Sequence, residues 1–331
     1  MINHRKIDHI KICLTEDVEA ADAGFGRIKL AHRALPEIDY DSIDLSTRFL
    51  GHKFRFPLMI EGITGGANQS KDINRDLARV AQKLGIGLGV GSQRAALEDG
   101  KLEATYKVRD IAPNIFLVAN LGAVQLNYGY GMEECRKAVE MIDADAIALH
   151  VNPLQEAIQP EGDKNFSGLS DKINKIAEKL GKPVIVKAVG DGMSYETARK
   201  LQVAAIDVGG LGGTHWAKVE GFRGGKQTRR LGETFSGWGI PTVDCIAEIS
   251  RLGVPTIASG GVRSGLDVAK SIALGADIAG MALPVLRAWK KGGASGVEDY
   301  LNCVVTELKV AAFLTGSRRI SELDGKIWRV D

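Results

Sequence analysis

The sequence predicts an α/β fold of the (β/α)8 barrel type, a TIM barrel, preceded by an N-terminal extension. From about residue 56, short apolar runs alternate with longer amphipathic stretches, and this alternation occurs eight times. Most of the runs are continuously apolar, as expected of parallel strands that are covered on both faces. Eight strands are more than an open doubly wound sheet normally contains, and no GxGxxG turn follows the first run, so a closed barrel is favoured.

The expected strands and helices follow one another regularly along the chain. The apolar runs that we expect to form strands are 56–64, 85–91, 115–122, 146–152, 183–190, 204–210, 255–261 and 278–284. Stretches with the pattern of amphipathic helices lie at 71–84, 133–142, 170–180, 195–202, 243–252, 264–274 and 290–317. Four helical stretches end in a Leu-Gly pair, where a left-handed helix cap is favoured. The glycines of these pairs are Gly85, Gly181, Gly253 and Gly275.

The chain divides into an N-terminal arm over residues 1–55 and a barrel over residues 56–331. A length of 331 residues alone suggests about two domains, but α/β barrels routinely exceed the usual size of one domain. The arm is dense in charge, with Arg5, Lys6 and His9 near its start. Taken alone, such a segment is a solvated surface arm.

Composition excludes several classes of protein. The formal net charge is +2, and no block of Lys and Arg stands out, so neither nucleic acid nor an anionic membrane is an expected partner. The four cysteines are far apart and form no CxxC pair, which argues against a zinc site or a disulfide scaffold and favours a reducing compartment. The first ten residues are too polar for a signal peptide, and no apolar run could span a membrane. We therefore expect a soluble cytoplasmic protein.

The active site of this fold lies at the carboxyl ends of the strands, so the residues that end each run are the candidates. The candidates from the first five runs are Thr64, Ser92, Gln93, Arg94, Asn120, His150, Asn152 and Lys187. The seventh and eighth runs lead into Gly261-Val262-Arg263 and Ala282-Leu283, where barrel proteins commonly bind phosphate through backbone N–H groups. Thr214, after the sixth run, could add a hydroxyl to the same phosphate. Plain turns are the alternative for these glycines.

Lys187 ends an apolar strand and so directs an ammonium toward the barrel axis, where burial is costly unless an acceptor is present. The pyrimidine edge of a flavin, which gains negative charge on reduction, is a suitable acceptor. The alternative is a structural ion pair with a carboxylate on a neighbouring strand. Asn120 and Ser92 could hydrogen-bond the same ring or be satisfied polar groups of the core.

Glu156 is the carboxylate that follows the fourth run most closely, and Gln155 precedes it. A single carboxylate beside phosphate oxygens is a usual way of holding Mg²⁺, with water in the remaining positions. Gln155 could hydrogen-bond a substrate. Solvation at the surface is the alternative for both side chains.

Taken together, these motifs resemble the type 2 isopentenyl diphosphate isomerases over almost the whole chain. The resemblance is carried by Arg5-Lys6 with His9, Ile63-Thr-Gly-Gly-Ala67, Ser92-Gln-Arg94, His150-Val-Asn-Pro-Leu-Gln-Glu156, Gly212-Gly-Thr-His-Trp216 and Gly260-Gly-Val-Arg263. The combination is specific, whereas each motif alone is weak. Ile63 departs from the Met that is expected in many relatives.

The resemblance implies an FMN enzyme that converts isopentenyl diphosphate to dimethylallyl diphosphate. It implies FMN contacts from Ile63, Thr64, Gly65, Ser92, Asn120, Lys187, Thr214, Gly261, Val262, Arg263, Ala282 and Leu283. It implies that the substrate diphosphate contacts Arg5, Lys6, Ser92, Gln93, Arg94, His150 and Asn152. Mg²⁺ would bind Glu156, and Gln155 would lie at the allylic carbons. The expected catalytic residues are Gln155, His150 and Lys187.

The same resemblance implies that NAD(P)H reduces the FMN and that the protein is a homo-oligomer, a tetramer or an octamer. The arm would fold over the barrel mouth, from the same chain or from a neighbouring subunit. Carboxylates are scarce among the expected rim residues, so we expect reduced FMN to act as acid and base. Lys187 would then stabilise the anionic flavin.

The long segment 217–237 is expected to be a loop, either a lid or an idle surface segment. Three rival functions share parts of the pattern. An FMN-dependent 2-hydroxy acid oxidase needs a His-Gly-Gly-Arg turn where this chain has Gly212-Gly-Thr-His215-Trp216. An IMP dehydrogenase-like enzyme needs a cysteine in the loop after the sixth run, and none occurs between Cys135 and Cys245. A non-catalytic flavin-binding protein leaves Gln155, Glu156 and the charged arm unexplained.

Overall fold

The computed structural model describes residues 2–19 and 21–329, and in this part of the chain eight parallel strands form a closed barrel. The barrel strands are β4 Leu58–Ile60, β5 Gly87–Gly89, β6 Leu117–Gly122, β7 Ala146–Val151, β8 Val184–Ala188, β9 Ala205–Asp207, β10 Thr256–Ala258 and β11 Ile278–Met281. Each pairs with the next, and β11 pairs with β4 to close the ring. The predicted barrel is confirmed, with every strand inside its predicted range.

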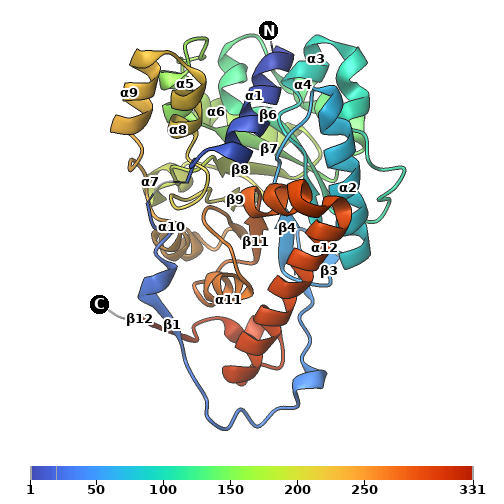
Figure 1. The fold of residues 1–331 in the computed structure, drawn as a ribbon, viewed down its shortest axis with the longest axis vertical. Coiled ribbons are helices and arrows are strands. Elements are labelled where there is room, and N and C mark those ends of the chain that lie inside the picture. The colour runs from blue at the N-terminus through green and yellow to red at the C-terminus, as the bar shows by residue number, and fades with distance from the viewer. Residues whose placement is uncertain (1, 20, 330–331) are drawn as a thin grey trace.

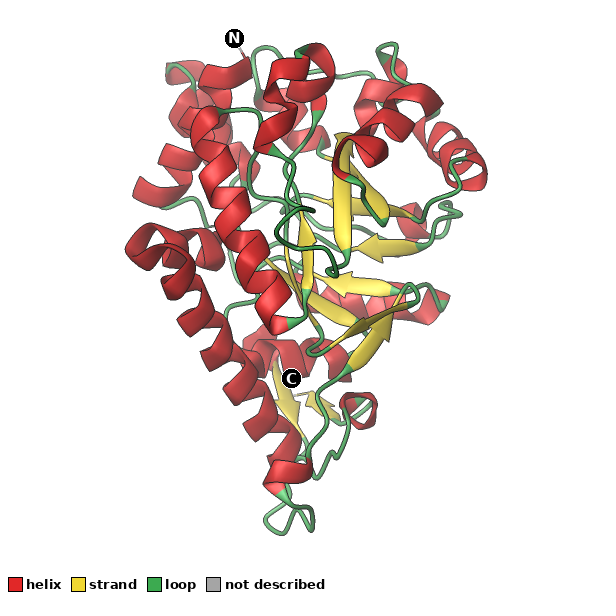
Figure 2. Ribbon diagram, turned by 90° about the vertical axis from the view of Figure 1, so that its right-hand side faces the viewer, coloured by secondary structure: helices red, strands yellow, loops and turns green. Residues whose placement is uncertain are grey.

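Helices surround the barrel, as Figure 2 shows. Their bounds are α2 Asn68–Leu84, α3 Arg94–Glu98, α4 Met132–Ile142, α5 Pro153–Ile158, α6 Leu169–Lys179, α7 Tyr195–Ala198, α10 Thr242–Ile249, α11 Gly265–Ala273 and α12 Leu283–Leu314. Short 3-10 helices lie at Phe25–Arg27, Tyr40–Ser42, Gly100–Thr105, Ala123–Asn127, Ser250–Leu252 and Ile320–Leu323. The left-handed cap predicted at Gly85 is confirmed, with φ 66°.

Three predicted bounds were wrong. Helix α7 ends at Ala198 after only four residues, whereas the predicted helix runs to residue 202. The chain leaves the helix early to reach β9, and the Gln202 N–H donates instead to Asn174 Oδ1 on α6. Helix α12 begins at Leu283 rather than near 290, and it kinks at Gly292 and Gly293. The segment 217–237 is not a loop. It forms α8 Trp216–Arg223 and α9 Lys226–Thr234, which are separated by two glycines.

The residues that precede the barrel lie at both of its ends (Figure 1). Helix α1, Ile2–Thr15, packs against α8 and α12 near the carboxyl ends of the strands. The hairpin of β2 Thr47–Phe49 and β3 His52–Phe54 packs against the opposite end, where its phenylalanines meet Phe116 in a buried cluster. Strand β1 Ile28–Leu30 pairs with β12 Ile327–Arg329. Within the described residues, no helix is both long and apolar enough to cross a bilayer.

Candidate active site

A cavity opens at the carboxyl ends of the barrel strands, and α1 of the same chain lines one part of its wall. Most of the residues predicted for the site line this cavity. They are Arg5, Lys6, Ile63, Thr64, Ser92, Arg94, Asn120, His150, Asn152, Gln155, Glu156, Lys187, Thr214, Gly261, Arg263, Ala282 and Leu283. Barrel closure therefore brings together side chains that are far apart in the sequence.

Three predicted residues lie behind the cavity wall. Gln93 is fully buried, and its side chain donates to Ala138 O at 2.8 Å and accepts from Asn120 N at 2.9 Å, so it supports the wall. Gly65 has φ 159°, and a Cβ there would lie 1.9 Å from the ring of Tyr106. Val262 is buried and does not line the cavity.

Lys187 lies on the cavity floor between two carboxylates. Its Nζ is 2.6 Å from Glu61 Oε2 and 3.2 Å from Asp207 Oδ2, and all three side chains are at most 11 % exposed. Burial alone would lower the pKa of Lys187, but attraction to Glu61 and Asp207 raises it above its ordinary value. Burial and the negative charge of Asp207 raise the pKa of Glu61 to about 7, although Lys187 partly offsets both. The ion pair that the sequence left open as an alternative is present.

Neither floor carboxylate was predicted from the sequence. Glu61 and Asp207 each lie within an apolar run that was assigned as a buried strand. A charged residue inside such a run is a signal in itself, because an unpaired charge is rarely buried. Two acidic residues and Lys187 in three buried strands should have predicted an ion-pair cluster.

His150 is held as a neutral ring with a fixed orientation. Burial and the nearby charges of Lys187 and Lys6 lower its pKa to about 3. The Asn120 amide N donates to Val90 O, which leaves Asn120 Oδ1 to accept from His150 Nδ1 at 2.8 Å. The other ring nitrogen, Nε2, therefore carries the lone pair.

Helix α1 brings two cations to the cavity. Lys6 has no carboxylate within 4 Å among the described residues, and burial together with the charge of Arg5 lowers its pKa to about 8. Arg5 lies 3.8 Å from Glu161 Oε1, which also pairs with Arg223 at 2.6 Å. These cations are placed to attract an anionic ligand.

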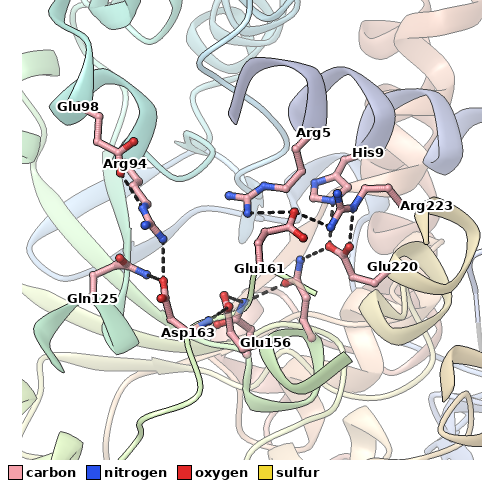
Figure 3. A network of polar contacts seen from close by, with 12 residues as sticks. Arg5, His9, Arg94, Glu98, Gln125, Glu156, Glu161, Asp163, Glu220 and Arg223 are labelled. Atoms are coloured by element: carbon pink, nitrogen blue, oxygen red, sulfur yellow. Dashed lines mark hydrogen bonds and ion pairs between the residues drawn. The ribbon is translucent and has the colours of Figure 1, made fainter. Parts of the chain in front are cut away.

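A polar network connects α1 with α5 and α8, as Figure 3 shows. At its centre is Glu220, which is fully buried and accepts from His9 Nε2 at 3.0 Å, Gln155 Nε2 at 3.0 Å and Arg223 Nε at 2.6 Å. Burial alone would raise the pKa of Glu220, but these bonds lower it to about 2. Burial lowers the pKa of His9, although its hydrogen bond with Glu220 and the charge of Glu220 partly offset this effect.

Glu156 lies beside this network and is only 8 % exposed. Its oxygens accept from Asn152 Nδ2 at 3.0 Å and from Asp163 N at 2.7 Å, and burial raises its pKa. Asp163 in turn accepts from Arg94 at 2.8 Å. Among the described residues that line the cavity, the carboxylates are Glu61 and Glu156, whereas Asp163 and Glu220 do not line it, so carboxylates are scarce there as expected.

No cluster of three or more His, Cys, Asp or Glu with metal-binding geometry occurs among the residues that the structure describes. Each oxygen of Glu156 accepts one hydrogen bond and keeps a second lone pair. This arrangement fits a Mg²⁺ ion that takes most of its ligands from phosphate oxygens and water.

The turns that the sequence predicts to bind phosphate form a backbone cradle. A Cβ on Gly213 would lie 2.8 Å from Gly261 N, so only glycine leaves this space open. Helix α12 begins after Ala282 with no side-chain cap, and its first amides remain available to an anion. Arg263 is bound by Glu19, which also pairs with Arg287, so one carboxylate is shared by two guanidinium groups. The residues present fit a flavin mononucleotide, since the glycine turns could hold its phosphate and Lys187 could interact with its ring.

Comparisons with known proteins agree with this geometry. The family model of the FMN-dependent dehydrogenases matches residues 12–108 and 131–330. A protein of Nostoc sp. named isopentenyl-diphosphate delta-isomerase is 50 % identical over 327 residues, and the match covers 96 % of this chain and 93 % of that protein. A protein of Methanoregula boonei with the same name is 51 % identical over 329 residues, and the match covers 96 % of this chain and 91 % of that protein.

Solved structures with lower identity share the fold. A lactate oxidase of Pediococcus acidilactici superposes with a TM-score of 0.65 at 20 % identity, covering 98 % of this chain and 87 % of its own. A flavocytochrome b2 variant with pyruvate bound gives 0.70 at 18 % identity, covering 97 % and 82 %.

Proposed function

The chain belongs to the isopentenyl-diphosphate delta-isomerases of the FMN-dependent dehydrogenase family, and from this premise we propose that it converts isopentenyl diphosphate to dimethylallyl diphosphate with FMN as cofactor. The observation that carries the proposal is that one cavity contains both a glycine cradle for a cofactor phosphate and two α1 cations for a substrate diphosphate.

Reduced FMN, when bound, supplies the acid and base chemistry that a double-bond shift needs. The chain's own residues hold and orient it. Lys187 would supply a positive charge to the pyrimidine edge of the ring, and Thr214 with the cradle glycines and the start of α12 would hold the phosphate. Ile63, Thr64, Ser92 and Asn120 complete the proposed contacts from the first three strand ends.

The substrate diphosphate is proposed to bind between α1 and the ends of β5 and β7. Within the described residues Lys6 forms no ion pair, and Arg5 contacts Glu161 at 3.8 Å and the Gln159 amide oxygen at 3.2 Å, so the ammonium of Lys6 and part of the Arg5 guanidinium are open to a diphosphate. Arg94 is already shared between Glu98 and Asp163 and would have to exchange a partner. His150 would accept a proton when the diphosphate arrives, because a nearby anion favours its charged form.

Mg²⁺ is proposed to join the diphosphate to Glu156, with water as its remaining ligands. Asn152 holds the Glu156 carboxylate in place. Gln155 donates to Glu220 at 3.0 Å and accepts from Asn152 at 2.9 Å, so its amide is fixed in orientation at the cavity wall. We place Gln155 beside the allylic carbons.

NAD(P)H is proposed as the reductant of the bound FMN, and a tetramer or octamer as the assembly. In either assembly, α1 is proposed to cover the mouth of its own barrel, since it lines the cavity of the same chain. The shielding would limit access of water to the reduced cofactor.

The 2-hydroxy acid oxidase alternative does not fit the cavity. That chemistry needs a histidine base after β9, but His215 is buried, does not line the cavity, and lies 3.1 Å from Trp238 O through its Nε2. Its ring serves as a structural contact between two loops.

The test is anaerobic incubation of FMN-loaded, reduced protein with isopentenyl diphosphate and Mg²⁺. We expect dimethylallyl diphosphate to form, and the Glu156→Gln protein to keep its FMN while losing at least a hundredfold in Mg²⁺-dependent turnover. A yellow protein that is inert under these conditions would support a non-catalytic flavin protein instead.

A further inference from the structure

The charged cluster on the cavity floor contains one carboxylate more than its single ammonium can balance. Asp207 accepts from Lys187, from Ser259 Oγ at 2.5 Å and from Gly209 N at 3.3 Å. Glu61 accepts from Lys187 through Oε2 alone, and its buried Oε1 has no hydrogen-bond partner among the described residues. The two acids therefore differ, and Glu61 is the one with an unsatisfied oxygen.

Glu61 borders the cavity proposed for the cofactor as well as the small space beneath it inside the barrel. It lines the cofactor cavity together with Lys187, whereas Asp207 does not, and a Cβ on Gly280 would lie 2.4 Å from Glu61 Oε1. The charged groups that contact it or its partners are Lys187 on β8 and Asp207 on β9, and Lys187 and Lys6 also act on His150. A new negative charge above Lys187 therefore acts most directly on Glu61.

We propose that Glu61 is a charge-balancing residue of the cofactor site, which is ionised while FMN is oxidised and takes up a proton from solvent when FMN is reduced. The proposal rests on the proposed function only in that FMN occupies the cavity. Protonation of Glu61 leaves Lys187 with one fewer anion, so more of its positive charge is directed to the reduced cofactor.

Reduction of the cofactor together with protonation of Glu61 consumes two electrons and two protons. A two-electron donor such as dithionite delivers two electrons to the cofactor, and one proton from solvent joins the cofactor to leave it with one negative charge. A second proton from solvent converts the Glu61 carboxylate to a carboxyl group. Two protons are then taken up for two electrons wherever Glu61 is ionised in the oxidised protein.

Burial and Asp207 raise the pKa of Glu61 to about 7, which sets the pH range of the effect. Below about pH 7 the carboxyl is protonated in both redox states, and only the cofactor takes up a proton. Above about pH 7 the second proton is added. The ring nitrogen of the reduced cofactor would add its extra proton at lower pH, whereas Glu61 adds one at higher pH, so the two groups change the proton uptake in opposite directions.

The test is the two-electron midpoint potential of the FMN-loaded protein, measured by spectroelectrochemistry from pH 6 to 9. Each proton per two electrons contributes about 30 mV per pH unit. We expect the slope to double on passing above about pH 7 in the wild type, and to stay at the one-proton value in Glu61→Gln. A one-proton slope throughout in the wild type, or an unchanged doubling in Glu61→Gln, would overturn the proposal.

Asp191→Asn is the matched control. Burial raises the pKa of Asp191 to about 6, but Asp191 lies outside the cofactor cavity, so its variant should keep the doubled slope. If Glu61→Gln fails to fold or to bind FMN, reduced-minus-oxidised infrared spectra of the wild type at pH 8 decide the question. A new carbonyl band of a protonated carboxyl that shifts in D₂O is expected, and its absence contradicts the proposal.

The outcomes separate failure of the role proposed for Glu61 from failure of the proposed isomerase function. A protein that binds FMN and isomerises isopentenyl diphosphate, yet shows a one-proton slope, refutes only the role of Glu61. A protein without affinity for FMN refutes the proposed function before the potential is measured.

Discussion

Burial sets the charge of individual residues in this site, and His150 shows the effect most clearly. Its pKa of about 3 means that the folded, ligand-free protein keeps a neutral ring at a pH where an unfolded chain carries a charged one. The unfolded state therefore binds more protons below about pH 6.5, and the free energy of unfolding falls as the pH falls. The loss continues until the pH reaches the folded pKa.

This linkage predicts a pH-dependent difference between the wild type and His150→Gln. Below about pH 6, the free energy of unfolding of the cofactor-free wild type should fall by about 1.4 kcal/mol per pH unit relative to the variant. Contributions from Glu61 and Asp191 are present in both proteins and cancel. Urea unfolding between pH 7.5 and 5 measures the difference, and a difference that does not change with pH would show that His150 is charged in the folded protein.

Lys6 is the second residue whose charge has a measurable consequence. A charge-assisted contact with a diphosphate contributes about 1.5–3 kcal/mol, so Lys6→Met should raise KM for isopentenyl diphosphate by about ten- to a hundredfold. Because its pKa is lowered to about 8, KM of the wild type should also rise above about pH 8.

The control for this experiment is Lys11→Met, since Lys11 is exposed on the same helix. Affinity for FMN should be unchanged in both variants. Equal KM values for Lys6→Met and Lys11→Met would remove Lys6 from the substrate site.

At the scale of elements, the cofactor phosphate site depends on how closely the loops after β9 and β10 approach each other. Gly213 and Gly261 meet across this approach, and α12 begins beside it without a side-chain cap. The Asp267 carboxylate accepts from Arg263 N and Ser264 N at the start of α11, so amides there are already used. The start of α12 is therefore the better anion site.

Substitution of Gly213 by Ala tests the close approach. The added Cβ would lie 2.8 Å from Gly261 N, so one of the two loops must shift. We expect the dissociation constant for FMN to rise at least tenfold, about 1.4 kcal/mol, in a fluorescence titration of cofactor-free protein. Gly225→Ala, where a Cβ meets nothing within 4 Å, should bind FMN as the wild type does. Equal affinities would place the phosphate elsewhere.

Elements with a strong local pattern were predictable, and elements defined by distant contacts were not. Strands such as β6 and β7 are continuous apolar runs, and their existence follows from the pattern. Helices α8 and α9 were taken for a loop because glycines interrupt a polar sequence, and their packing against each other and α1 overrides that local signal. The early end of α7 depends on Asn174, a contact that no local pattern contains.

At the scale of the whole molecule, closure of the barrel explains why the strand-end residues converge. The rim could be predicted because each candidate follows an apolar run at the same end of a parallel strand. The partners of the Glu61, Asp207 and Glu220 carboxylates could not be assigned in this way, since most of them lie on other strands, on α1 or on α5. Gln93 was assigned to the substrate from its motif, but its side chain is used within the wall.

The central claim is that FMN and a prenyl diphosphate occupy one cavity at the same time. Titration of the reduced, FMN-loaded protein with isopentenyl diphosphate and Mg²⁺, followed by the cofactor's absorbance, tests this most directly. We predict a saturable spectral change with one equivalent per chain that is weakened in Lys6→Met. An unchanged spectrum, at concentrations where calorimetry shows the diphosphate to be bound, would contradict the account.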